Sequence, residues 1–464
     1  MTANTPSATL TRTLANFVAG FSPNVLPAAV RERTIEVILD GTGALLAASN
    51  PDYSTGQLIA EFVQSQGGPK EATVVGHDFK TGTVDAALAN ATMGYACDVE
   101  PHHPEGILHS ISVTVPTALA LSEKIGATGA EFVAAVALGC EVAYRVSMAL
   151  GPREQYDLGF HPSAICGTFG AAATASRLLG LEIDAVVRAL GLAAGQASGL
   201  MAWESDGSEN SRPFQMGVAA RGGITAALLA KSGFGAPDAV FDHGHTVFRA
   251  FSRAPRPELL TKDLGLRFDG VMELALKPYS CCAFLHPGLD ALIGLVRAED
   301  IEAKDVERLV IHFAKSGAHC IDGNPLKSHS AQYALALAVK THDVGVADLF
   351  FDRRDTDPEI AELSRRIEFV QDEAELEALF PDFYATRIEL ETRPGARFER
   401  RGDVARGYPE TPMSRAEIED KFRALAGSVA SDRRVAAIEA SVAGLWEAPE
   451  VADYAALLGR PAGN

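Results

Sequence analysis

Residues 128–150 read TGAEFVAAVALGCEVAYRVSMAL, and this run indicates the fold class. Thr128 and Glu131 have the spacing of a capping box, in which two side chains satisfy free backbone N–H groups at the start of a helix. The residues that follow are apolar nearly all round the helix, so we expect this helix to lie between other helices. Similar Ala-rich runs at 167–179, 183–195 and 219–231 predict a compact helical bundle.

The pattern changes after about residue 266. Residues 308–313, 366–370 and 386–392 alternate in the manner of strands, and charged stretches such as 372–379 are expected to be helical. A second capping box, Ser414 with Glu417, starts another helical region that continues to residue 458.

These patterns predict a mainly α fold with two domains, the number expected for a chain of 464 residues. The large helical-bundle domain is predicted to be discontinuous, formed by residues 1–268 and 409–464. Residues 269–408 are predicted to form a smaller α+β lid domain.

The charge of the chain excludes some partners. There are 41 Lys and Arg against 60 Asp and Glu, a net charge of −19, so we expect neither nucleic acid nor a membrane surface to bind. None of the six cysteines forms a CxxC pair, and no signal peptide or uncharged membrane-spanning stretch is visible. We expect free thiols and a cytoplasmic protein.

Familiar catalytic motifs are absent: the sequence contains no P-loop, dinucleotide fingerprint, GxSxG or HExxH. The densest polar segment is 97–110, CDVEPHHPEGILHS, with three histidines and three carboxylates. Such a segment can run acid–base chemistry or bind a metal, although metal binding is the weaker reading because no helical spacing fixes the ligands. A solvated, turn-rich loop is an equally good explanation of its composition.

Four more polar residues lie in apolar or glycine-rich surroundings, and each also has a plain structural explanation. His161 precedes a helix and is more often a satisfied structural residue. Arg212, in the polar stretch 206–217, either clamps a carboxylate or lies on a surface loop. Lys277 is a carboxylate anchor or a lysine at a domain edge, and Tyr333 is more often a core residue than a catalyst.

Taken in order, these segments resemble the MmgE/PrpD superfamily, which includes 2-methylcitrate dehydratase, cis-aconitate decarboxylase and iminodisuccinate epimerase. The resemblance covers nearly the whole chain. Its blocks are TRTLANFVAGF (11–21), ILDGTGALLA (38–47), ANATMGYACDVE (89–100), LHSISVTVPTALALSE (108–123), GFHPSAICGTFGAAA (159–173), RPFQMGVAARGG (212–223), LKPYSCCAFLHPGLDA (276–291), SGAHC (316–320) and TPMSRAEIEDKF (411–422).

The resemblance implies a helical domain built from both chain ends, an α+β lid, a homodimer, no cofactor and no metal. It also implies a cleft between the domains that binds a small polycarboxylate. By matching motif positions, the catalytic residues are Asp98, His109, His161, Lys277 and Tyr333.

The same comparison assigns substrate binding to Arg212, Lys277 and His103. His102 or His103 stands where some relatives have threonine. Many relatives carry lysine at the position of Arg212, and often a histidine near Gln215. Arginine binds carboxylate but is a poor proton donor at neutral pH.

The reactions of the superfamily share a proton transfer at carbon next to a carboxylate. His109 and His161 are the expected proton carriers, and Arg212 and Lys277 are the expected carboxylate partners. Asp98 is expected to orient a histidine or to fix its charge state. The loss of a titratable donor at Arg212 favours an iminodisuccinate-type epimerase.

The alternatives are a 2-methylcitrate-type dehydratase, a cis-aconitate-type decarboxylase, a metal hydrolase and a non-catalytic protein that binds polycarboxylates. Every enzymatic reading without a metal requires the predicted site residues to meet in one anion-binding cavity between the two domains.

Overall fold

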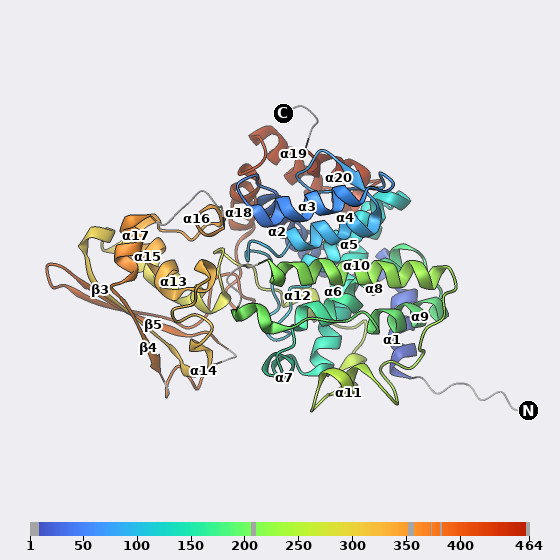
Figure 1. Ribbon diagram of the computed structural model, residues 1–464, viewed down its shortest axis with the longest axis horizontal. Coiled ribbons are helices and arrows are strands. Elements are labelled where there is room, and N and C mark those ends of the chain that lie inside the picture. The colour runs from blue at the N-terminus through green and yellow to red at the C-terminus, as the bar shows by residue number, and fades with distance from the viewer. Residues whose placement is uncertain (1–8, 206–209, 351–356, 373, 381–382, 461–464) are drawn as a thin grey trace, which may run out of the picture.

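The computed structural model describes residues 9–205, 210–350, 357–372, 374–380 and 383–460. Two parts are visible in Figure 1, a large helical body and a smaller part with a four-stranded sheet. The mainly α fold predicted from the sequence is confirmed.

The helical body is formed by the helices α1 (Leu10–Gly20), α2 (Ala28–Ala48), α3 (Ser54–Gln66), α4 (Thr83–Met93), α5 (Ile111–Ile125), α6 (Gly129–Leu150), α7 (Pro152–Asp157), α8 (Pro162–Leu178), α9 (Ile183–Ala194), α10 (Ser211–Lys231), α11 (Val247–Phe251), α12 (Asp269–Met272), α18 (Arg415–Gly427), α19 (Asp432–Ala443) and α20 (Ala452–Leu458). A two-stranded ribbon, β1 (Ala72–Thr73) with β2 (Lys80–Thr81), lies beside them. The C-terminal helices α18 and α19 pack on α2, so both ends of the chain build this part.

Helix α6 is the core helix that its sequence predicts. The capping box is present, with the Thr128 hydroxyl accepting from the Glu131 N–H and the Glu131 carboxylate accepting from the Thr128 N–H. The helix packs against α8, and a Cβ atom on Gly139 would lie 2.0 Å from the Thr174 hydroxyl, so the contact needs glycine there. Among the described residues, α6 alone is long and apolar enough to cross a membrane, but 94% of its most apolar window is buried inside the protein.

We call the second part the lid. It contains α13 (His286–Ala298), α14 (Lys315–Ala318), α15 (Ala331–Thr341), α16 (Val346–Leu349), α17 (Pro358–Ser364), β3 (Val306–Ala314), β4 (Ile367–Asp372), β5 (Thr386–Thr392) and β6 (Arg397–Gly402). The sheet order is β4-β3-β5-β6, with β3 and β4 parallel and the other pairs antiparallel. Helices α13 and α15 pack against this sheet.

The three predicted strands correspond to β3, β4 and β5. The helix predicted at 372–379 is wrong: Asp372 ends β4 and residues 375–380 form turns. Two backbone N–H groups of this segment, those of Ala374 and Glu375, donate to the Asp372 carboxylate, and a turn therefore follows the strand. The domain boundaries at 268 and 409 stay a prediction, although α12, just past the first boundary, packs on α6 of the helical body.

Candidate active site

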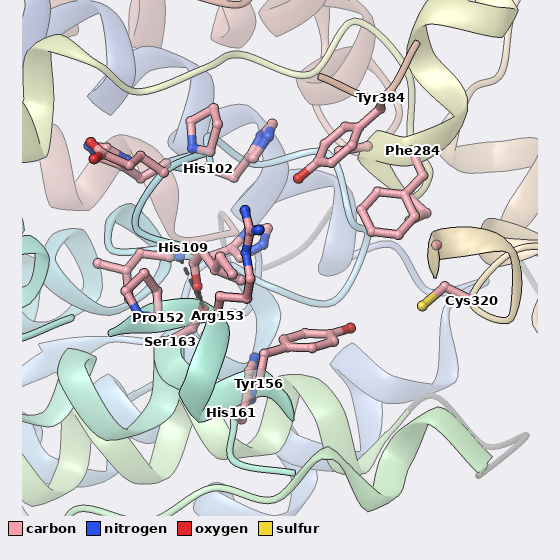
Figure 2. Close-up of a pocket in the computed structure, with 18 of the residues that line it drawn as sticks. His102, His109, Pro152, Arg153, Tyr156, His161, Ser163, Phe284, Cys320 and Tyr384 are labelled. Carbon is pink, nitrogen blue, oxygen red and sulfur yellow. Dashed lines mark hydrogen bonds between the residues drawn. The ribbon is translucent and has the colours of Figure 1, made fainter. Parts of the chain in front are cut away.

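One cavity of about 1710 Å³ lies between the helical body and the lid (Figure 2). Its lining includes five of the residues predicted from the sequence to meet, namely Asp98, His109, His161, Arg212 and Lys277. They come from four separate regions of the chain. The structure therefore brings these five residues together in one cavity, as the sequence analysis requires.

Backbone pairing brings two of these regions together. His102, in the loop between α4 and α5, exchanges both backbone hydrogen bonds with Ala275, at 2.9 and 2.7 Å. Lys277 lies two residues beyond Ala275, which places its side chain beside the same loop. The Ser280 hydroxyl adds a further bond to the Cys97 carbonyl oxygen at 2.7 Å.

Asp98 is the charged centre of the site. Its Oδ1 atom lies 2.6 Å from Lys277 Nζ and 3.4 Å from Arg212 Nη1, and all three side chains are 5% exposed or less. Burial alone would raise the pKa of the Asp98 carboxyl, but Lys277 and Arg212 outweigh burial and hold its pKa well below its usual range. Asp98 has a φ of 50°, in the left-handed region that non-glycine residues rarely adopt, which is typical of functional sites.

Lys277 and Arg212 therefore stay cationic in a buried place. Burial lowers the pKa of the Lys277 ammonium, but Asp98 and Glu100 reverse this and raise it. Arg212 lies over the Tyr95 ring, with its guanidinium carbon 4.5 Å from the ring centroid. Two fixed cations share the Asp98 carboxylate, so this corner of the cavity attracts an anion.

His109 is oriented by Glu100, and the role expected for Asp98, to orient a histidine or to fix its charge state, stays a prediction. Glu100 is completely buried and its Oε1 atom lies 2.7 Å from His109 Nδ1. The carboxylate fixes the proton on Nδ1 and leaves Nε2 for the cavity. Burial lowers the pKa of His109, and the hydrogen bond and charge of Glu100 oppose that decrease without cancelling it.

His161 is a neutral histidine with both nitrogens engaged. Its Nδ1–H donates to Gln215 Oε1 at 2.9 Å, and its Nε2 accepts from the Tyr95 hydroxyl at 3.3 Å. Gln215 is held in this orientation because its Nε2 donates to the Leu200 carbonyl oxygen at 2.9 Å. Burial lowers the pKa of His161 to about 3, so it acts as an acceptor near neutral pH.

His103 lines the cavity, but its ring holds the loop together instead of facing a substrate. Nδ1 accepts from the Gly106 N–H at 3.1 Å, and Nε2 donates to the Asp269 carbonyl oxygen at 3.2 Å. The ring is stacked on Tyr144, with 4.5 Å between the centroids. Both ring nitrogens bond the backbone, and the substrate-binding role of His103 stays a prediction.

His102 is the histidine of this pair that lies next to the charged centre. It stacks on His109 with ring centroids 5.8 Å apart, and its Nε2 is 3.2 Å from the Tyr408 hydroxyl.

The structure does not bring Tyr333 to the site. Its hydroxyl donates to the Asp348 carbonyl oxygen at 3.4 Å, and its ring lies under Lys327 Nζ, 5.3 Å away, outside the cavity lining. His329 of the same sequence segment lines the cavity instead. Burial lowers the pKa of His329 to about 4, and Asp98 partly opposes this.

Sequence reasoning gave no role to Glu100, Tyr95, Gln215 and His329. Glu100 stands in the segment of high histidine and carboxylate density, and His329 in the segment chosen for Tyr333, so composition pointed to both neighbourhoods. Tyr95 and Gln215 look like ordinary core and helix residues, and only the fold shows that they hold His161.

A metal site is not formed by the side chains in the described parts of the chain, where no three His, Cys, Asp or Glu residues are grouped to hold an ion. The three histidines of the 97–110 segment have separate partners, as described above. The cysteines Cys97, Cys140, Cys166, Cys281, Cys282 and Cys320 are all free thiols.

The buried neutral histidines predict a loss of stability in mild acid. The folded-state pKa values of about 4 for His103, about 3 for His161 and about 4 for His329 lie below the unfolded value of about 6.5. Between these values the unfolded chain binds more protons, so the free energy of unfolding falls as the pH decreases from 6.5 to 4. Each histidine contributes at most ~1.4 kcal/mol per pH unit.

Urea denaturation between pH 4.5 and 8 measures this effect, with a flat profile expected above pH 7. A protein whose unfolding free energy stays constant from pH 7 to pH 5 would show that these histidines are not held neutral.

The cavity is therefore a buried, charge-lined site between a helical body and a lid. The family models for the MmgE/PrpD N-terminal and C-terminal domains match residues 12–260 and 279–445. The chain belongs to the MmgE/PrpD family.

Known relatives align with almost the whole chain. A cis-aconitate decarboxylase of Aspergillus terreus is 27% identical over 97% of this chain and 96% of its own length. A cis-aconitate decarboxylase-like protein of Aspergillus oryzae is 27% identical, with 99% of both chains covered. The cis-aconitate decarboxylase of Mus musculus is 24% identical over 90% of this chain and 87% of its own.

Proposed function

We propose that this protein is a lyase that removes CO2 from an unsaturated polycarboxylate of the cis-aconitate type, using only its own side chains. The observation that carries the proposal is the meeting of two buried cations and the His109–Glu100 pair in one cavity. The names of the relatives support decarboxylation among the reactions of the family.

The cations would hold the substrate during the reaction. Arg212 and Lys277 pair with the carboxylates that stay on the product. A bound dianion then competes with the Asp98 carboxylate for these two cations. When the bond to the departing carboxylate breaks, CO2 leaves and the electron pair remains on the carbon skeleton, spread towards a retained carboxylate. The two cations lie where this negative charge develops and so stabilise the transition state.

His109 would then complete the reaction by giving a proton to carbon. Its Nε2 faces the cavity and its Nδ1 proton is fixed by Glu100. The negative charge of a bound polycarboxylate raises the pKa of His109 from its low value in the empty site and favours the imidazolium form. One proton moves from Nε2 to the carbanion, and solvent later returns a proton to the ring. General-acid steps of this kind contribute about 10²–10⁴-fold in rate.

The epimerase expected from the sequence is the second proposal. Epimerisation needs proton carriers on both faces of the substrate carbon, and His109 and His161 both belong to the helical body, in contact with the same Tyr95 ring at 4.6 and 5.8 Å between centroids. His161 already uses both ring nitrogens in bonds to Gln215 and Tyr95, so His109 is the better placed of the two to carry a proton. A 2-methylcitrate-type dehydratase would need a donor for a departing hydroxyl, and the hydrogen-bonded pair of His102 and Tyr408, both in the cavity lining, is a candidate.

The test is incubation in D2O with cis-aconitate, 2-methylcitrate, citrate and iminodisuccinate, followed by proton NMR and trapping of CO2. We expect CO2 equal to the cis-aconitate consumed and one carbon-bound deuterium in the product. Deuterium in recovered iminodisuccinate without CO2 would identify an epimerase, and a new alkene from 2-methylcitrate a dehydratase. If the protein bound these acids and converted none of them, it would be a non-catalytic protein that binds polycarboxylates.

A further inference from the structure

The loop that carries Asp98 and Glu100 is fixed by side chains from distant parts of the chain. Four consecutive carbonyl oxygens of this loop, those of residues 96–99, each accept a hydrogen bond from a side chain. In chain order the donors are the Tyr53 hydroxyl at 3.0 Å, the Ser280 hydroxyl at 2.7 Å, Lys277 Nζ at 3.2 Å and Lys421 Nζ at 2.7 Å. Because buried carbonyl groups need partners, the positions of these donors determine the course of the loop.

Lys421 is the donor that reaches the loop from the C-terminal part of the chain. It lies on α18, 322 residues beyond the Val99 carbonyl to which it donates. Its side chain is only 8% exposed, and its Nζ atom is 2.6 Å from Oδ1 of Asp40, a completely buried residue of α2. Helices α2 and α18 pack against each other (Figure 1). The ammonium is therefore held by a fixed carboxylate while it binds the loop.

The Val99 carbonyl stands between the two carboxylates of the site. Asp98, on one side, is held separately by Lys277, which bonds both its carbonyl oxygen and its Oδ1 atom. Glu100, on the other side, is completely buried, and its Oε1 atom lies 2.7 Å from His109 Nδ1. A displaced Val99 carbonyl would rotate the next peptide unit and move Glu100 relative to His109, since the peptide is planar.

Lys421 and Glu100 also interact through their charges. Burial lowers the pKa of the Lys421 ammonium, and the negative charges of Asp40 and Glu100 oppose this decrease. Burial raises the pKa of the Asp40 carboxyl, and the charge of Lys421 opposes that increase. Asp40, Lys421 and Glu100 therefore form a buried series of alternating charges that ends at His109.

We propose that Lys421, held in place by Asp40, is a positioning residue of the active site. It fixes the Val99 carbonyl and so keeps Glu100 within hydrogen-bonding distance of His109. The C-terminal part of the chain thereby acts on the site, although no residue of α18, a helix described in full, lines the cavity. The inference rests on the proposed function only for the role of His109 as proton donor.

The Nδ1 proton of His109 reports this geometry without any turnover. In protein with isotope-labelled histidine, an Nδ1 proton shared with a carboxylate gives a downfield NMR signal, which is assigned as the one absent from His109→Gln. We expect Lys421→Met to shift this signal upfield or to broaden it beyond detection. The matched control is Arg145→Met, which breaks the buried ion pair of Arg145 and Glu141 on α6, also 2.6 Å long, and should leave the signal in place. An unchanged signal in folded Lys421→Met overturns the inference.

Kinetics on cis-aconitate shows whether Lys421 acts through Glu100. Lys421→Met should lower kcat about 30-fold, as part of the general-acid contribution, and change KM by less than about fivefold. In a Glu100→Gln background the same change should lower kcat by less than about threefold, because the step it supports is already lost. Lys421→Arg keeps a cationic donor and should stay within about tenfold of the wild-type kcat. Equal losses from Lys421→Met in both backgrounds, or an equal loss in Arg145→Met, overturn the inference.

A second variant covers a loss of folding. Lys421→Met leaves the Asp40 carboxylate buried without its cation, and such a change is strongly destabilising. If this variant does not fold, the double variant Asp40→Asn with Lys421→Met, which carries neither charge, replaces it in both tests with the same expected results.

Failure of the proposed function is distinguishable from failure of this inference. A lost His109 signal in Lys421→Met, together with no CO2 release by the wild type from any polycarboxylate, rejects the lyase and keeps the positioning role of Lys421. CO2 release by Lys421→Met at the wild-type rate, together with an unchanged signal, keeps the lyase and rejects that role.

Discussion

Replacing His109 by glutamine should lower kcat for CO2 release by about 10³-fold, within the range observed for loss of a general acid. Glutamine keeps a hydrogen-bonding group of similar size near Glu100 but cannot carry the proton to carbon. The substrate carboxylates can still pair with Arg212 and Lys277, and these ion pairs already form when the substrate binds. We therefore expect KM to change by less than about fivefold. Steady-state kinetics on cis-aconitate, with circular dichroism to confirm folding, measures both effects.

Two companion variants separate chemistry from loop structure. Glu100→Gln should lower kcat by about 10²-fold, because His109 loses the carboxylate that fixes its tautomer and supports its imidazolium form. His103→Ala should instead cost about 2 kcal/mol of stability, through the bonds to Gly106 and Asp269, with kcat within about threefold of wild type. If the His109→Gln protein retained more than a tenth of the activity, His109 would not be the residue that transfers the proton.

The fold was predictable because its signals are local. The capping boxes at Thr128 and Ser414 determine where two helices begin to within one turn. The residues after Thr128 are apolar nearly all round the helix, which predicts that this helix is buried. The helix expected at 372–379 failed for a local reason as well. Its charged residues suit a helix, but the Asp372 carboxylate binds the next backbone N–H groups and a turn forms.

The sequence predicts which segments form the site better than it predicts which side chains of those segments enter it. Asp98, Arg212 and Lys277 lie in segments that the sequence singles out, and the structure brings them together. His102 and His103 are adjacent and both line the cavity, and no pattern in the sequence tells which one lies next to the charged centre. That choice depends on the backbone pairing of His102 with Ala275.

Tyr333 and His329 show the same limit. They lie four residues apart in one segment, and the turn between η6 (Lys327–His329) and α15 decides which side chain points to the cavity. The partnership of Glu100 with His109 also depends on a loop whose Asp98 has a left-handed backbone, which no helical or strand period encodes.

The second large effect is expected for Lys277→Met. The substitution removes the ammonium 2.6 Å from Asp98 and leaves the buried carboxylate paired with Arg212 at the longer distance of 3.4 Å. Breaking a buried pair in this way costs about 3–5 kcal/mol of stability. We expect kcat/KM to fall by about 10³-fold as well, because one of the two cations that hold the substrate and its developing charge is lost.

A double-mutant cycle with Asp98→Asn distinguishes the two consequences. In the Asp98→Asn background the Lys277→Met change no longer strands a carboxylate, so its cost in unfolding free energy should be about 2–3 kcal/mol smaller than in the wild type. Turnover should not return, because the substrate still lacks its second cation. If the double variant regains activity, Lys277 serves only to neutralise Asp98, and the carboxylates of the substrate must be held elsewhere in the cavity.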